Sequence, residues 1–563
     1  MAVSNPFRGV GLGGLVVAMA TAVTASEPAD LVLLGGKVWA GKRLPAATAV
    51  AVRGEHVLAV GSDDAVRGFL GPKTRVVELQ GRLVVPGFND AHVHFIDGGF
   101  GLLSVDLRDA KDEGELARRI AAHAKGLPAG TWILNGNWDH QRWPSKREPG
   151  KDLLDATTPD HPVFVNRLDG HMALANSMAL KLAGLDRNTK DVAGGTIVRD
   201  ERGEPTGLLK DNAMDLVSRA IPPPSRERNK AAARAALREA ARFGVTSIQD
   251  NSPVDALPTY QDLRAAGELT ARMYVWRYAS ESFAALQSAG VRTGLGDDWI
   301  RLGALKILAD GSIGSATAAL YEPFLSNPAS TGLLIQPKEE LERMIAEADA
   351  AGFQLAVHAI GDRANALVLD AFAKAVARNG PRDRRFRIEH AQHVAEADLG
   401  RFASLGVVAS VQPSHCIDDM RFVEKHVGKA RLPDAYRWRT FQAKGVALAF
   451  GTDWFVEPLD PRLGLYAAVT RELPEGGPTG GFQPQEKITL EDALDAYTRG
   501  SAFAELAEDR KGTLQAGRLA DLVVFGADLF GAEPRRILTT PVDLTVVGGR
   551  VVFERVMPDR PRP

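Results

Sequence analysis

The chain has little cysteine, few aromatic residues and no excess of either charge. Its 563 residues include one cysteine, Cys416, which excludes an internal disulfide framework. The 68 basic and 70 acidic residues give a net charge of −2, without the basic footprint of a nucleic-acid-binding protein. Past residue 25 no apolar run is long enough to span a membrane, so stable membrane insertion of the mature chain is not expected. What remains is ordinary globular composition, 45% hydrophobic and 25% charged, enough for a large core.

The first 25 residues have the layout of a secretory signal peptide. Arg8 precedes an apolar run from Val10 to Val23, and small residues follow at Ala25 and Ser26. Cleavage is expected after Ala25, and the missing twin-arginine pair favours ordinary secretion across the inner membrane into the periplasm. The alternative is an uncleaved N-terminal anchor.

Both ends of the mature chain read as short strands with glycine turns. "DLVLLGGKVWAG" and "AVAVRGEHVLAVG" near the start have the same texture as "GRLADLVVFGADLF" and "VDLTVVGGRVVFE" near the end. We expect residues 26–85 and 490–563 to form one composite β-sandwich domain that the intervening chain splits in sequence.

Between them, apolar strands alternate with alanine-rich helical stretches, which is typical of βα units and a parallel sheet. The first strand ends at His92, and seven more are predicted at 244–250, 271–277, 301–308, 353–359, 386–391, 406–413 and 445–453. Eight strands with interleaved helices predict an α/β fold, a (β/α)8 TIM-like barrel, over residues 86–489. The gap after the first strand is too long for one connection, so residues 96–243, approximately, are expected to form an inserted subdomain at the barrel mouth.

Ligand-type side chains recur where the predicted strands end. In "VVPGFNDAHVHF", His92 and His94 lie two residues apart, so both imidazoles of an extended strand face one spot. One such pair alone is more often structural, but functional residues of these barrels gather at the carboxyl ends of strands. Imidazoles and a carboxylate suit Zn²⁺ or a similar divalent ion. The candidate set is His92, His94, Lys306, His358, His390 and Asp453.

This set, in this order, resembles the metal site of the amidohydrolase superfamily. The words "PGFNDAHVHF", "LKILADGSIGSATAAL", "VHAIGDRAN", "RIEHAQ" and "GTDWFVEPLDP" are similar to its YtcJ-like branch, amidohydrolase family 3, from about Ala29 to Glu554. The resemblance implies one or two divalent metal ions, zinc being expected, held by the six residues. It implies that Lys306 is N-carboxylated and bridges two ions, and that Asp453 binds metal and shuttles a proton. An unmodified lysine in this apolar strand would need a carboxylate partner such as Asp310, and the site would then hold one metal.

Further residues are candidates for substrate binding. Asp169 and His171 lie in the insert, Trp138 could wall the pocket or belong to the core, and Asp310 and Arg363 follow later strands. His415 and Cys416 follow the seventh strand and are interpreted as an ordinary loop.

The predicted activity is hydrolysis of a carbon–nitrogen bond other than a peptide bond, in an N-acyl or N-formyl amine or a cyclic amide. A metal-bound hydroxide would attack the carbonyl, with Asp453 as general base and then general acid. Deamination is one alternative. Deaminases of the superfamily resemble the pattern "HAxE", in which the glutamate protonates the ring, and this chain has Gly361 at the glutamate position, which counts against deamination. Ester or lactone hydrolysis, and a non-catalytic secreted binding or regulatory protein, are the others. The expected partner is a small-molecule substrate, with no nucleic acid, and a homodimer is one open assembly.

Overall fold

The computed structural model describes residues 27–140, 143–167, 172–192, 195–252 and 256–556. The predicted signal peptide lies outside these residues, so export stays a prediction. Among the described helices, none combines the length and the apolarity that a membrane crossing needs.

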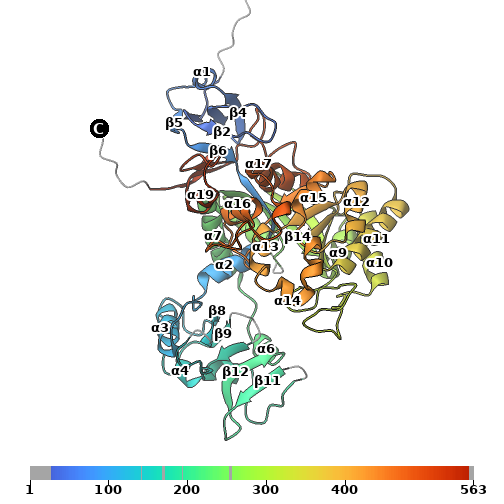
Figure 1. Cartoon of the computed structure of the whole chain (residues 1–563). Helices are drawn as coiled ribbons and strands as arrows, with labels where there is room; N and C mark the ends of the chain where they lie inside the picture. The colour runs from blue at the N-terminus through green and yellow to red at the C-terminus, as the bar shows by residue number, and fades with distance from the viewer. Residues whose placement is uncertain (1–26, 141–142, 168–171, 193–194, 253–255, 557–563) are drawn as a thin grey trace, which may run out of the picture.

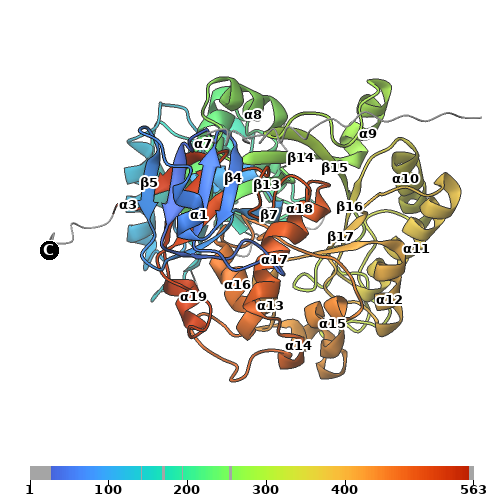
Figure 2. The same ribbon diagram turned by 90° about the horizontal axis from the view of Figure 1, so that it is seen from above.

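The centre of the molecule is a sheet of eight parallel strands, and the predicted barrel is confirmed. Hydrogen bonds link neighbouring strands in chain order, and Figure 2 shows the helices α9 to α12 outside the curved sheet. The first and last strands meet beyond their ends, where Val93 bridges to Trp454 and the His94 amide donates to the Trp454 carbonyl at 2.6 Å. The strands are β7 (Phe88–Val93), β13 (Val245–Asp250), β14 (Arg272–Tyr278), β15 (Ile300–Leu308), β16 (Leu355–Ala359), β17 (Arg387–His390), β18 (Val408–Val411) and β19 (Leu448–Phe450).

The covering helices form because their apolar residues recur at helical spacing and their ends are capped. In α7 (Arg226–Phe243), the Ser225 hydroxyl accepts from the Arg228 amide at the start, and Gly244 takes a left-handed conformation (φ 78°) at the end. Its alanine-rich face is buried against α2 (Phe95–Leu103) and the barrel. The other barrel helices are α8 (Ala256–Ala265), α9 (Ala279–Ser288), α10 (Lys338–Ala350), α11 (Asp362–Asn379), α12 (Glu396–Leu405), α13 (Pro413–Asp419), α14 (Val423–Val427), α15 (Trp438–Ala443) and α16 (Pro461–Thr470).

Strands from the two chain ends share one sheet. β6 (Leu83–Pro86) pairs antiparallel with β20 (Leu522–Phe525), more than 400 residues later in the sequence, in the order β2-β6-β20-β21-β22. A second sheet, β4-β3-β1-β5, packs on it over a valine- and leucine-rich core. The remaining elements are β1 (Leu31–Leu34), β2 (Lys37–Val38), β3 (Ala49–Arg53), β4 (His56–Gly61), α1 (Asp63–Arg67), β5 (Arg75–Glu78), α19 (Arg535–Thr539), β21 (Val542–Val547) and β22 (Arg550–Glu554).

Residues 490–504, which the prediction placed with the sandwich, are helical. They form α17 (Leu490–Asp495), a π-helical turn (Ala496–Gly500) and α18 (Ser501–Ala504), and they contact β7 and β19 of the barrel. The strands of the sandwich resume at β20.

The insert between β7 and β13 is built around its own five-stranded sheet, ordered β11-β12-β10-β9-β8. Separate apolar cores cover the two faces of this sheet. In Figure 1 it extends from the barrel on the side away from the sandwich, connected through α2 and α7. Its elements are α3 (Glu113–Ala124), β8 (Ile133–Trp138), α4 (Asp152–Asp155), β9 (Val163–Arg167), β10 (Met172–Ala175), α5 (Ser177–Leu182), β11 (Gly195–Arg199), β12 (Pro205–Asp211) and α6 (Met214–Ser218).

Candidate metal centre

Three ligand-type side chains meet at the carboxyl ends of β7 and β19. Asp453 Oδ1 lies 3.5 Å from His92 Nε2 and 3.3 Å from His94 Nε2. The three ligand atoms lie within 4.8 Å of one another. Metal–nitrogen bonds of about 2.0–2.1 Å place tetrahedral ligands roughly 3.3 Å apart, so this spacing suits one shared metal ion.

A buried carboxylate orients His92. His92 Nδ1 lies 2.7 Å from Glu389 Oε2, and Arg387 Nε donates to the other oxygen of Glu389 at 2.6 Å. Burial alone would raise the pKa of Glu389, but Arg387 and the His92 contact outweigh it and hold that pKa at about 2. Glu389 is therefore an anion that accepts the Nδ1 proton and leaves the Nε2 lone pair of His92 facing Asp453, as histidine ligands of metals are commonly held.

Asp90 fixes the loop that carries Asp453. Its carboxylate accepts from the Thr452 amide (2.9 Å), the Thr452 hydroxyl (2.6 Å) and the His92 amide (3.2 Å). Asp453 has φ 57° and His390 has φ 73°, a left-handed backbone that residues other than glycine rarely adopt. Such backbone is held only where its surroundings impose it, and here it lies at the residues that face the centre.

His415 joins a second group of ligand atoms, with His390 and Asp453. Its Nε2 lies 3.6 Å from Asp453 Oδ2. The sequence prediction interpreted this residue as part of a loop. His415 lies in the first turn of α13, which begins at Pro413, and this turn places its ring beside the ring of His390.

Lys306 and His358 also lie at this end of the barrel. Lys306 is buried, and its Nζ lies 3.3 Å from His92 Nε2 and 5.7 Å from the centre of the Trp276 ring. Burial lowers the pKa of Lys306 to about 8. His358 Nε2 lies 3.1 Å from the Gly311 carbonyl oxygen, which only accepts, so Nδ1 is the ring atom left for another partner.

The predicted substrate-binding residues are spread over several places. Asp310 is buried beside His358, and its carboxylate accepts the amides of Ile360, Gly361 and Ala319, so it fixes loops and does not pair with Lys306. Trp138 is buried in the core of the insert, where its indole donates to the Val165 carbonyl. Of the two roles considered for Trp138, pocket wall or core, the structure shows the core role.

Arg363 is exposed at the first turn of α11. Asp169 and His171 lie outside the described residues.

The buried polar atoms of the centre fit a metal ion. Among the described residues, Asp453 Oδ1 and His415 Nε2 are buried without a hydrogen-bond partner. Burial alone would raise the pKa of Asp453, but the neighbouring His92, His94 and His390 rings outweigh it and hold that pKa well below its usual range. An anionic oxygen surrounded by imidazoles is the donor set that Zn²⁺ and similar ions prefer.

Large apolar side chains lie exposed beside the centre. The Phe455 ring lies 6.0 Å from the His94 ring, and Phe455 and Val456 are 56% and 61% exposed. Exposed apolar side chains beside a polar centre are typical of a substrate-binding surface.

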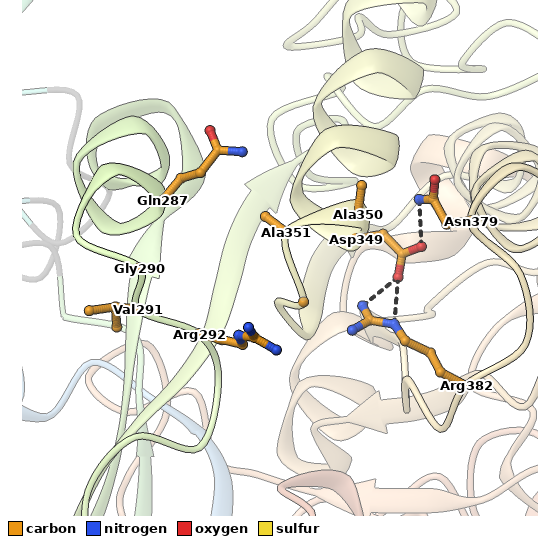
Figure 3. Close-up of a pocket in the computed structure, with 10 residues that line it drawn as sticks. Gln287, Gly290, Val291, Arg292, Asp349, Ala350, Ala351, Asn379 and Arg382 are labelled. Atoms are coloured by element: carbon orange, nitrogen blue, oxygen red, sulfur yellow. Dashed lines mark hydrogen bonds and ion pairs between the residues drawn. The ribbon is translucent and has the colours of Figure 1, made fainter.

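A cavity of about 560 Å³ lies at the opposite face of the barrel (Figure 3). It is lined by the ends of α9, α10 and α11 and by the segments that lead into the next strands. Asp349 there accepts from Asn379 Nδ2 at 2.8 Å and from Arg382 Nε at 3.2 Å. No histidine lines it, and in these barrels activity resides at the carboxyl ends of strands, so it is not the active site.

A (β/α)8 barrel with imidazoles and a carboxylate gathered at these strand ends defines the class of metal-dependent hydrolases. The amidohydrolase family model matches residues 75–553, and the chain belongs to that family.

Three named relatives are similar in sequence over most of this chain and most of their own length. The protein LONG AFTER FAR-RED 3 of Arabidopsis thaliana is 36% identical over 93% of this chain and 92% of its own length. YtcJ of Bacillus subtilis is 33% identical over 86% of this chain and 91% of its own, which confirms the predicted branch. An N-substituted formamide deformylase of Arthrobacter pascens is 28% identical over 93% and 98%. The crystal structure of an uncharacterized metal-dependent hydrolase from Pyrococcus horikoshii superimposes with a TM-score of 0.77 at 28% identity, over 90% of this chain and 99% of that one.

Proposed function

We propose that the protein hydrolyses the carbon–nitrogen bond of N-formyl or other N-acyl amines, with Asp453 as the proton-transfer group. The observation that carries this is the placement of Asp453, an anion that faces His92 and His94 with one oxygen and His415 with the other. His92, His94 and Asp453 would hold a divalent metal, zinc in our proposal, which would supply Lewis acidity and lower the pKa of a bound water.

The chain's own residues would carry the proton. Asp453 is deprotonated and therefore able to accept the proton of the attacking water. It then returns this proton to the leaving nitrogen, which departs as a free amine while the carbonyl carbon keeps the water oxygen. Glu389 holds His92 in place throughout, because the buried Arg387 keeps it anionic.

Lys306 supports a covalent modification. A buried ammonium with no ion pair among the described residues is costly, and N-carboxylation would replace it with a carboxylate beside His92. We propose this modification. Measurement of the intact mass in bicarbonate tests it: the unaltered protein should gain the mass of one carbon dioxide, and Lys306→Arg should not.

Deamination is disfavoured by packing around Gly361. A Cβ at this position would lie 2.0 Å from the Ala319 carbonyl oxygen, so the glutamate that superfamily deaminases carry there has no room. The similarity to an N-substituted formamide deformylase and the exposed Phe455 and Val456 instead support an N-acyl amine with an apolar N-substituent.

The test is turnover by the metal-loaded protein on a panel of N-formyl arylalkylamines, N-acyl amino acids, cyclic amides and esters. Amine release from one amide class is expected, and Asp453→Asn should lower kcat by about 10²- to 10⁴-fold. Asp509→Asn, at an exposed aspartate far from the centre, is the matched control and should keep the full rate. A metal-loaded protein that hydrolyses none of the panel, or an equally active Asp453→Asn protein, would overturn the proposal.

A further inference from the structure

We infer that Gln249 and Ser410 are positioning residues of the metal centre, which act on His92 through Arg387 and Glu389. The inference rests on the proposed function, because it takes His92 to be a metal ligand. Gln249 lies on β13 and Ser410 on β18, and both side chains are fully buried. They belong to one buried hydrogen-bond network inside the barrel, here called the core network, whose members are Glu505, Asn89, Gln249, Ser410, Arg387, Glu389 and His92.

The guanidinium of Arg387 is the hub of the core network. It donates to Gln249 Oε1, to Ser410 Oγ at 2.7 Å and to the Ala91 carbonyl at 2.7 Å. The Trp276 ring covers it, with the ring centre 4.6 Å from the guanidinium carbon. These contacts come from β13, β18, β7 and β14, so four strands other than its own fix the position of this buried cation.

The hydrogen bonds of Gln249 allow its amide one orientation. Glu505, paired with Lys511 at 2.6 Å, accepts from Asn89 Nδ2 at 2.6 Å, which turns Asn89 Oδ1 toward Gln249. Gln249 Nε2 donates to that oxygen at 3.3 Å and to a main-chain carbonyl of α18 at 2.8 Å. Oε1 is the amide atom that remains, and it accepts from Arg387. Gln249 is therefore held as an acceptor for Arg387.

On the side of the metal centre, the same guanidinium holds Glu389. Arg387 Nε donates to Oε1 at 2.6 Å and Nη2 to Oε2 at 3.3 Å, and Oε2 lies 2.7 Å from His92 Nδ1. Loss of Gln249 or Ser410 as an acceptor would leave a guanidinium N–H unpaired inside the barrel, which is costly. The guanidinium would then turn toward another acceptor and draw Glu389 away from the imidazole. The position of His92 thus depends on side chains that do not touch it.

Zinc affinity and fold stability, measured on the same variants, separate positioning from general support of the fold. Gln249→Met keeps the length of the side chain but removes the acceptor, and it should weaken Zn²⁺ binding about 10-fold in competition with a chelator. Gln354→Met is the matched control. Gln354 is also buried, and in the described structure its amide contacts Tyr274 and two main-chain carbonyls, none of them in the core network. Gln354→Met should lower the urea midpoint of the metal-free protein as Gln249→Met does, but leave the Zn²⁺ affinity unchanged.

Ser410→Ala is the second variant, and it removes a single hydroxyl from the core network. It should weaken Zn²⁺ binding in the same direction, by about threefold or more, because the guanidinium loses one of its acceptors. Thr545→Val, which removes a buried hydroxyl bonded to the Ala241 carbonyl at 2.7 Å, is its control and should keep the affinity. The visible absorption of bound Co²⁺, which depends on the geometry of the ligands, should change in Gln249→Met and Ser410→Ala and stay the same in both controls.

Unchanged affinity in either core-network variant, once circular dichroism shows that it is folded, would overturn the inference. An equal loss of affinity in Gln354→Met would overturn it as well, because any loosening of the barrel interior would then weaken the metal. Affinity does not depend on turnover. Zinc binding without hydrolysis would refute the proposed function alone, and hydrolysis with unchanged affinity in Gln249→Met would refute the positioning role alone.

Discussion

At the scale of single residues, the site depends on the groups behind the ligands as much as on the ligands themselves. Glu389 is fully buried between Arg387 and His92 and contacts no solvent. Its negative charge fixes the tautomer of His92 and increases the basicity of its Nε2.

We predict that Glu389→Gln weakens metal binding by about 10- to 100-fold while His92 stays in place. The amide cannot accept the imidazole proton with a full negative charge, so His92 becomes a weaker ligand. Competition against a chromophoric chelator measures the affinity. Glu396→Gln, at a surface carboxylate bonded to Arg437, is the control. Unchanged affinity in Glu389→Gln would contradict the orienting role.

Strand ends were readable from the sequence, but the supporting groups were not. His92, His94, His390 and Asp453 each follow directly from a buried run, so the rule on strand ends found them. Glu389 was missed although it shares a face of β17 with Arg387, two residues earlier, which was the available signal. His415 was missed because it comes four residues after β18, and only the helical turn of α13 returns it to the centre.

At the scale of elements, the same contacts close the barrel and place Asp453. Two bonds from Thr452, donated by its amide and its hydroxyl, join the loop after β19 to Asp90 of β7. Hydrophobic periodicity in the sequence cannot predict such a contact, because it links residues more than 360 positions apart.

We predict that Thr452→Val lowers the free energy of unfolding by about 1–3 kcal/mol, because it leaves a buried oxygen of Asp90 unsatisfied. It should also weaken metal binding, since Asp453 follows directly. Urea unfolding and chelator competition measure the two effects. Thr539→Val, at an exposed threonine at the end of α19, should change neither. Lost stability with intact metal affinity would argue against coupling between closure and site.

At the opposite face, Asp349 connects the ends of α10 and α11. It accepts from Arg384 Nε at 2.8 Å as well as from Asn379 and Arg382, and its side chain is fully buried. Burial alone would raise the pKa of Asp349, but these donors outweigh it and lower the pKa below its ordinary value.

A lowered folded-state pKa means that the carboxylate stabilises the fold above the unfolded pKa of about 3.9, and that this stabilisation is lost as pH falls through the folded value. Asp349→Asn should therefore cost roughly 3 kcal/mol at pH 7, and less below about pH 4, where the unaltered protein loses the same interaction. Urea unfolding at a series of pH values measures this. A difference that stays constant down to pH 3 would contradict the account.

At the scale of the whole molecule, the sandwich is joined to the barrel by buried charge. Arg272, at the start of β14, donates to Asp521 at 2.7 and 3.0 Å, and Asp521 also accepts the Gly548 amide at 2.8 Å. A composite domain of both chain ends was readable from the matching strand texture, but this contact between remote segments was not.

We predict that Asp521→Asn costs about 3 kcal/mol. It removes the carboxylate bound to the buried Arg272 guanidinium, which keeps the Asp298 carbonyl at 3.0 Å and has Glu55 3.9 Å away. Barrel and sandwich should unfold in one shifted transition, seen alike by tryptophan fluorescence and far-ultraviolet circular dichroism. Asp528→Asn, whose partner Lys37 is exposed, should cost under about 1 kcal/mol. Two separated transitions would show that the domains are not coupled in this way.

The most direct test of the central claim, that these strand ends hold a catalytic metal, is a reconstitution titration. Chelated protein receives Zn²⁺ in steps, and bound metal and hydrolysis of an N-formyl arylalkylamine are measured on the same samples. We predict no turnover without metal, activity that rises with occupancy of the centre, and none in Asp453→Asn at any loading. Full activity in the metal-free protein would contradict it.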